Sequence, residues 1–142
     1  MKNKLFVGAS LIFLWVGFYV NTTISASQPF RLYNLLLSLG YIAFWIVMLR
    51  QCGQSRAVMR YIAVLWGLCA VTAFFNLFYT NGTFLLLFML LLAPLFGIQF
   101  VIADAIVCII IIGVFSLGIT ITAFVFLRRL KRAQKEGQEE EE

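Results

Sequence analysis

Apolar residues occur in long unbroken runs that short polar or charged stretches separate. The longest run covers 84–127, which is 44 residues in which Asp104 is the only charged side chain. A single helix of that length would measure about 66 Å at 1.5 Å per residue. A bilayer core about 30 Å thick is crossed by roughly 20 helical residues. The run is therefore too long for one crossing and barely long enough for two.

The remaining apolar runs are each of a length that suits one crossing. With the second half of the longest run, they predict membrane-spanning helices over 5–24, 32–49, 61–79 and 105–127. Between them we expect a turn at Gln28-Pro29, a basic loop over Arg50–Arg60, and a compact turn at Asn81-Gly82. The first run also resembles a signal peptide cleaved after Ala26. We favour an uncleaved helix, because aromatic residues crowd the far end of this run.

The segment 84–103 either forms a fifth crossing or enters and leaves the membrane on one side. Basic residues collect in cytoplasmic loops, and this rule favours an even number of crossings. Four crossings place ten basic residues inside and Arg31 alone outside, whereas five divide them almost equally. We therefore predict four crossings with both termini in the cytoplasm, and a re-entrant or outer-leaflet segment at 84–103. Its irregular part near Pro94–Gly97 should be covered by protein.

Composition places the chain among α-helical integral membrane proteins. It is 63% hydrophobic and 12% charged, with a mean hydropathy of +0.98, and a soluble domain of this size could not bury so much apolar surface. The expected fold is an all-α bundle of four transmembrane helices within one domain, 1–135, with five helices as the alternative. Residues 136–142 should form an acidic disordered tail. The net charge of +5 does not indicate nucleic acid, because the basic residues flank apolar segments.

The chain lacks most side chains that carry chemistry. It has no histidine, and Asp104 is its only carboxylate side chain before residue 136. Nucleophile–histidine pairs, paired carboxylates and histidine-rich metal sites are therefore excluded. Neither a CxxC motif nor a Gly-rich phosphate loop is present. We expect no catalytic, cofactor or metal residues, and hence no enzyme.

Asp104 is the most informative single residue. An ionisable side chain at membrane depth is a functional hypothesis by default. The four-crossing arrangement places Asp104 and Arg31 at the same outer interface, where we expect an ion pair between the second and last spans. The alternative is that Asp104 caps the last helix. Asn34 and Ser38, which lie in or near spans, should hydrogen-bond between helices.

Small residues recur at helical spacing on two of the expected spans, and such stripes let helices approach closely. The stripe consists of Gly113, Ser116, Thr120 and Ala123 on the last helix, with Ala63, Gly67 and Ala70 on the third. It serves either packing within the bundle or contact with a second copy or another membrane protein. The basic residues after it should contact anionic lipid headgroups: Arg128, Arg129, Lys131, Arg132 and Lys135.

The predicted function is that of a small non-enzymatic multipass protein in the plasma membrane. It would pack with itself or serve as an accessory subunit of a larger membrane complex. The alternative is a small transporter or a holin-like pore, which an oligomer could line with Ser116, Thr120 and Thr122. Neither reading involves a cofactor.

Overall fold

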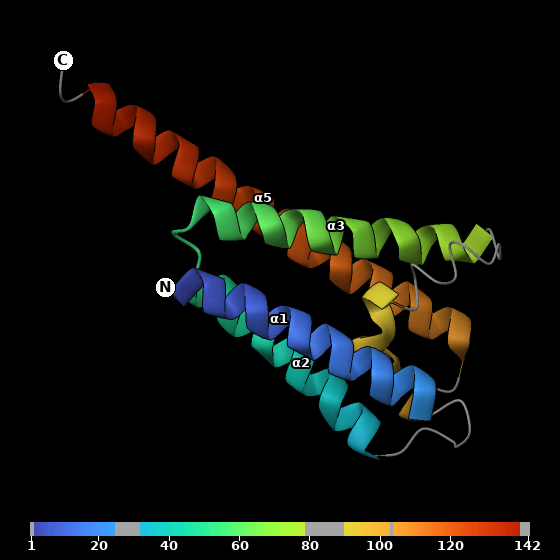
Figure 1. Cartoon of the computed structure of the whole chain (residues 1–142). Coiled ribbons are helices and arrows are strands. Elements are labelled where there is room, and N and C mark those ends of the chain that lie inside the picture. Colours follow the sequence, from blue (N-terminus) through green and yellow to red (C-terminus); the bar gives the residue numbers. More distant parts are fainter. Residues whose placement is uncertain (1, 25–31, 79–89, 103, 140–142) are drawn as a thin grey trace.

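The structure is a computed structural model that describes residues 2–24, 32–78, 90–102 and 104–139 (Figure 1). The described part is helical and contains no strand. Its elements are α1 (Lys2–Phe18), the π-helix η1 (Tyr19–Ile24), α2 (Leu32–Gln51), α3 (Arg56–Phe78), the 3₁₀-helix η2 (Ala93–Phe100) and α5 (Ala105–Glu139). A short helical turn at 90–92 leads into η2.

Four helices are long and apolar enough to cross a membrane, as the hydrophobic runs predicted. Their apolar stretches are Lys4–Asn21, Leu32–Gln51, Arg56–Phe78 and Ala105–Gln134. The described part of the ambiguous segment forms only a shorter apolar helix, Leu90–Phe100. Residues 84–89 lie outside the described residues. The all-α bundle is confirmed, whereas its insertion in a membrane stays an inference from length and composition.

The helices extend further than the apolar runs indicated. The expected loop Arg50–Arg60 is mostly helical, because α2 ends at Gln51 and α3 begins at Arg56. The amide of Met59 donates to the carbonyl of Ser55 at 3.0 Å, which closes the first turn of α3. At the other end, α5 runs to Glu139, into the segment that we expected to be disordered. Lys, Arg, Ala, Gln and Glu are all strong helix formers, so this polar end can continue the helix.

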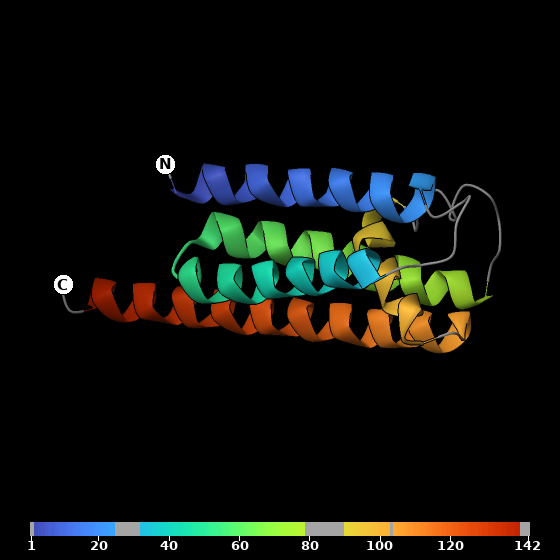
Figure 2. The same ribbon diagram turned by 90° about the horizontal axis from the view of Figure 1, so that it is seen from below.

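The helices form two groups with η2 wedged between them (Figures 1 and 2). One group is the antiparallel pair α3 and α5, which make the most extensive contact in the molecule. In the other group α1 lies beside α2, and both contact η2. The first residues of α1 and the last residues of α5 lie toward the same end of the bundle (Figure 1).

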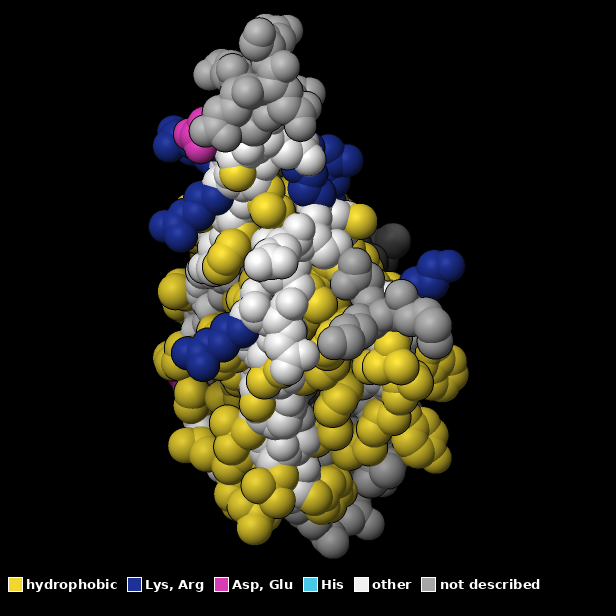
Figure 3. Space-filling model, turned by 90° about the vertical axis from the view of Figure 1, so that its left-hand side faces the viewer, with side chains coloured by type: hydrophobic (Ala, Val, Ile, Leu, Met, Phe, Trp, Pro, Cys, Tyr) yellow, Lys and Arg dark blue, Asp and Glu magenta, His cyan; other side chains and the backbone are white. Residues whose placement is uncertain are grey.

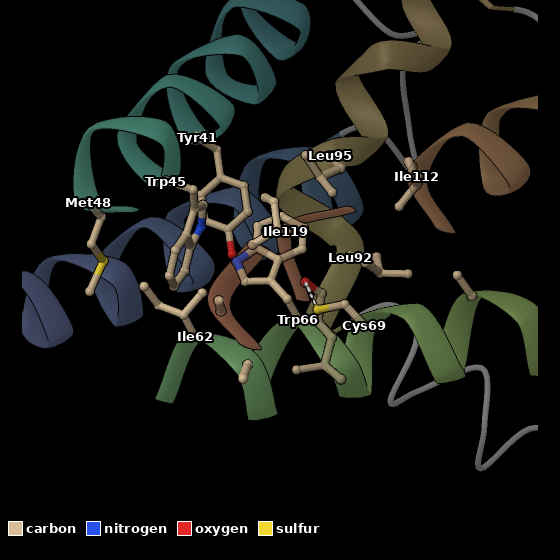
Figure 4. Close-up of a cluster of buried hydrophobic side chains, with 14 of the residues drawn as sticks. Tyr41, Trp45, Met48, Ile62, Trp66, Cys69, Leu92, Leu95, Ile112 and Ile119 are labelled. Carbon is tan, nitrogen blue, oxygen red and sulfur yellow. Dashed lines mark hydrogen bonds between the residues drawn. The ribbon is translucent and has the colours of Figure 1, made fainter. Parts of the chain in front are cut away.

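Aromatic side chains join the two groups in the core (Figure 4). Trp45 of α2 and Trp66 of α3 are fully buried, and their rings meet edge to face with centroids 5.4 Å apart. Trp66 also contacts Tyr41 at 6.0 Å and Phe115 of α5 at 5.6 Å. Such aromatic pairs are worth about 0.5–1.5 kcal/mol beyond the area they bury. Bulky rings thus fill the space between α2 and α3.

Candidate functional site

A buried polar cluster fixes η2 to α2 and to the end of the first helix. The side-chain amide of Asn21 donates to the carbonyl of Ala93 at 2.7 Å, and the amide of Asn34 donates to Oδ1 of Asn21 at 2.7 Å. The hydroxyl of Ser38 donates to the carbonyl of Pro94 at 2.6 Å. All three side chains are buried. The cluster therefore satisfies carbonyls where η2 departs from α-helical geometry.

The chemistry of this cluster is structural. A buried carbonyl without a hydrogen bond costs about 1–3 kcal/mol, and lipid offers no donor to replace the missing one. Residues 94–97 are buried, as expected for an irregular segment covered by protein. Sequence reasoning expected interhelical hydrogen bonds from Asn34 and Ser38 but gave no role to Asn21. Asn21 lies in η1, and no pattern in the sequence around it signalled that role.

Close backbone approach completes the seat of η2. A Cβ atom added at Gly97 would overlap the backbone carbonyl group of Asn34, and it would lie 2.6 Å from Oγ of Ser38. A Cβ atom added at Gly17 would lie 2.6 Å from three atoms of Pro94. Glycine at these two positions allows α1 and α2 to pack closely against two sides of η2.

Asp104 caps α5. Its Oδ1 accepts hydrogen bonds from the amides of Ile106 at 2.8 Å and Val107 at 3.0 Å. The side chain is exposed, and it provides the anionic N-terminal cap that a helix favours. Arg31 lies outside the described residues, so an ion pair between it and Asp104 stays a prediction.

The small-residue stripe packs inside the chain. Gly113, Ser116, Thr120 and Ala123 of α5 are buried, as are Ala63 and Ala70 of α3. A Cβ atom added at Gly113 would lie 3.4 Å from Cβ of Ala73, and one added at Gly67 would lie 3.8 Å from Cγ2 of Thr120. The two parts of the stripe thus face each other along the α3–α5 contact. A partner protein would therefore have to bind a surface other than this stripe.

The basic residues beyond the stripe are placed for contact with headgroups. Arg128, Arg129, Lys131 and Arg132 are exposed on the last turns of α5, and the side chain of Lys135 is not described. Of the cysteines, Cys52, Cys69 and Cys108 are free and buried. Among the described residues, no three His, Cys, Asp or Glu side chains are grouped to hold a metal ion.

One face of the first helix, formed by α1 and the start of η1, carries exposed apolar side chains. Leu11, Ile12, Trp15, Val16 and Tyr19 line a hollow of about 430 Å³ on it. Trp15 is 71% exposed. Leu11, Trp15 and Tyr19 follow one another at intervals of four residues, so they form a single ridge along the helix. We call these five residues the α1 face.

Comparison with protein-family models, curated proteins and solved structures finds no match to this chain.

Proposed function

We propose that this protein is a non-enzymatic accessory subunit of a complex in the plasma membrane, and that a transmembrane helix of its partner packs on the α1 face. The bundle anchors the chain, and the hollow on the α1 face receives side chains of the partner. The observation that carries the proposal is this hollow, which Trp15 and its neighbours form on the exposed side of the first helix.

The depth of Trp15 supports a protein partner in preference to lipid alone. Tryptophan in membrane helices gathers at the two interfaces. Trp15 lies about 20 Å along the helix from Lys2, at 1.5 Å per residue, and nine residues before the end of η1 at Ile24. It therefore lies well inside an apolar core about 30 Å thick. At that depth a large exposed ring suits an interface anchor, since tryptophan and tyrosine are enriched among the residues that dominate protein interfaces.

The packing of α1 supports the same proposal. Its contacts to the other long helices are few and largely aromatic, such as Phe13 on Phe44 at 5.2 Å and Phe6 on Phe44 at 6.4 Å. In Figure 2 the blue helix α1 lies at the edge of the bundle, away from α5. The α3–α5 pair already uses the small-residue stripe. The α1 face, by contrast, is exposed and available for association.

Charge supports the orientation that we propose, with both termini in the cytoplasm. The starts of α1 and α3 and the ends of α2 and α5 lie at one end of the bundle (Figure 1). These four ends carry ten of the eleven Lys and Arg residues. The positive-inside rule assigns such an end to the cytoplasmic side.

A photo-crosslinking amino acid in place of Trp15 tests the partner proposal in intact cells. A matched variant carries the same group at Val64, which is 63% exposed on α3. We expect one discrete protein adduct from position 15 and none from position 64. The adduct should decrease strongly when Leu11→Ala is added, because that change shortens the ridge. Lipid adducts alone at position 15, or equal protein adducts at both positions, would contradict the proposal. An adduct of two copies of this chain would indicate self-association instead.

The pore or transporter alternative receives no comparable support. Its candidate lining residues turn their hydroxyls onto their own helix: Ser116 donates to the carbonyl of Ile112 at 2.7 Å, and Thr120 donates to that of Ser116 at 2.8 Å. The side chains of Ser116 and Thr120 are buried, whereas that of Thr122 is exposed and donates to the carbonyl of Gly118 at 2.8 Å. A lining that used Ser116 and Thr120 would require α3 and α5 to separate.

A further inference from the structure

A basic pocket opens between α3 and α5 at the end of the bundle where we place the cytoplasm. Its volume is about 350 Å³, and it is lined by Arg56, Arg60, Phe124, Leu127, Arg128 and Lys131. The two arginines of α3 are four residues apart, and the four residues of α5 fall at i, i+3, i+4 and i+7. Each set therefore lies on one face of its helix. Figure 3 views this end of the molecule, where Lys and Arg side chains project beside hydrophobic ones.

We propose that this basic pocket binds the phosphate-bearing headgroup of an anionic phospholipid. Among the described residues, four cationic side chains and no acidic one line it. Arginine holds phosphate oxygens with paired N–H groups, which a point charge cannot do. Basic pockets between transmembrane helices on the cytoplasmic side recognise headgroups of this kind. The inference goes beyond the partner proposed for the α1 face and requires only that the bundle lies in a membrane.

The pocket is already organised without a ligand. Nη2 of Arg56 donates to the carbonyl of Leu130 at 3.2 Å, which links the start of α3 to α5. That contact uses one of the five N–H donors of the guanidinium group, and others remain for an oxyanion. Like charges three or four residues apart on a helix repel each other. Two such pairs lie in the pocket, Arg56 with Arg60 and Arg128 with Lys131. A bound phosphate would reduce the repulsion within each pair.

The apolar part of the lining favours a lipid over a free phosphate ion. Phe124 and Leu127 lie one turn before Arg128 and Lys131 on the same face of α5. They continue the apolar surface of the helix toward the bilayer centre, where the exposed residues Ile121 and Leu117 follow. A phospholipid can therefore place its phosphate among the four cations while its acyl chains run along α5. A free phosphate would leave the apolar part unused.

The pocket also divides the basic tail into two groups. Arg128 and Lys131 line it, whereas Arg129 and Arg132 are exposed and do not. One residue further along a helix is about 100° further around it. The two groups are alike in charge, and they differ in whether they line the pocket. This offers a matched control within the same two turns of helix.

The test measures binding of lipid to the purified full-length protein in neutral detergent by native mass spectrometry. The probes are a phosphatidylglycerol and a phosphatidylcholine with identical acyl chains, together with glycerol 3-phosphate and inorganic phosphate. The variants are Arg60→Gln with Arg128→Gln, and the control Arg129→Gln with Arg132→Gln. Arg56 is left intact because it also links the two helices. Circular dichroism verifies that each variant keeps the helical content of the parent.

We expect the parent chain to bind the phosphatidylglycerol in preference to the phosphatidylcholine. The pocket variant should lose about 30-fold in affinity for it, since each basic residue near an anionic surface contributes a factor of about five. The control variant should lose less than about twofold, because Arg129 lies on another face of α5 and Arg132, one turn beyond Arg128, does not line the pocket. Restoring Arg60 and Arg128 as lysines should recover only part of the affinity.

Equal losses in the two variants would overturn the proposal, because binding would then follow diffuse charge. Equal affinity for the two lipids would also overturn it. If glycerol 3-phosphate or inorganic phosphate binds as tightly as the lipid, the site is a phosphate site and the lipid assignment fails. None of these results changes the adducts expected from position 15, so the two proposals can fail separately.

Discussion

Replacing Gly97 with alanine should destabilise the bundle strongly, although it adds one methyl group. The new Cβ atom would overlap the backbone carbonyl group of Asn34 and lie 2.6 Å from Oγ of Ser38. A rotamer change cannot move a backbone carbonyl, so η2 must shift away from α2. That shift breaks the hydrogen bond from Ser38 to the carbonyl of Pro94.

The size of the effect follows from two costs. Overpacking a close contact costs about 1–3 kcal/mol, and a buried carbonyl that loses its donor costs about 1–3 kcal/mol more. Alanine also stabilises the folded state by about 0.4–1 kcal/mol, because it reduces the conformational entropy of the unfolded chain. We therefore expect Gly97→Ala to lower the free energy of unfolding by about 3 kcal/mol.

Gly40→Ala is the matched control. Gly40 lies on α2, and an added Cβ atom there has nothing within 4 Å. The same chemical change should be neutral or stabilising by up to about 1 kcal/mol, because alanine favours a helix over glycine. Unfolding of the full chain in detergent is followed by tryptophan fluorescence, which reports on the buried rings of Trp45 and Trp66. A difference between the two variants below about 0.5 kcal/mol would refute the assigned seat of η2.

Three further predictions concern the polar cluster, the cap and the connection between α2 and α3. Asn34→Ala should lower the free energy of unfolding by about 1–3 kcal/mol, because it leaves the buried Oδ1 of Asn21 without its donor. An unchanged unfolding midpoint would contradict the stabilising role of the cluster. Asp104→Ala should lower the free energy of unfolding by about 1 kcal/mol, and Asp104→Asn should lower it much less, since asparagine also caps helices. Coupling between Asp104→Asn and Arg31→Gln in a double-mutant cycle would support the predicted ion pair, whereas strict additivity would contradict it. Burial raises the pKa of the Cys52 thiol and shields it, so a maleimide should label it more slowly than a Gln54→Cys variant at an exposed position. In intact cells an impermeant maleimide should label neither residue, and labelling of the Gln54→Cys variant would reverse the proposed orientation.

Hydrophobicity alone was enough to predict the four long helices, because a stretch of about 20 apolar residues has few other uses. It was less informative about where they end. The basic segment Arg50–Arg60 was expected to be a loop, yet most of its residues favour a helix and only 52–55 separate α2 from α3. The last helix likewise continues past its apolar part to Glu139. Polar helix formers extend a membrane helix without any hydropathy signal.

The small-residue stripe could be predicted, but the choice between its two roles could not. Spacing shows that Gly113 and Thr120 share a face, whereas only the fold shows that Ala73 and Gly67 lie opposite them. The cluster around η2 was harder to foresee. The side-chain amide of Asn21 donates to the carbonyl of Ala93, 72 residues away. Its role depends on which carbonyls a 3₁₀-helix leaves without partners. No local pattern around Asn21 encodes that geometry.

The path of the chain between α3 and α5 bears on the question that the longest apolar run raised. Since α3 and α5 are antiparallel neighbours, Phe78 and Ala105 lie toward the same end of the bundle (Figure 1). A segment that joins them must return to the end at which it started. The described helix Leu90–Phe100 is about 20 Å long at 1.5–2 Å per residue, which is shorter than a bilayer core of about 30 Å. These two facts support the proposal that 84–103 is re-entrant, as do the donors that side chains of η1 and α2 supply to its carbonyls. A segment that enters lipid and turns back must carry irregular backbone, and its neighbours must then provide the hydrogen bonds that lipid cannot.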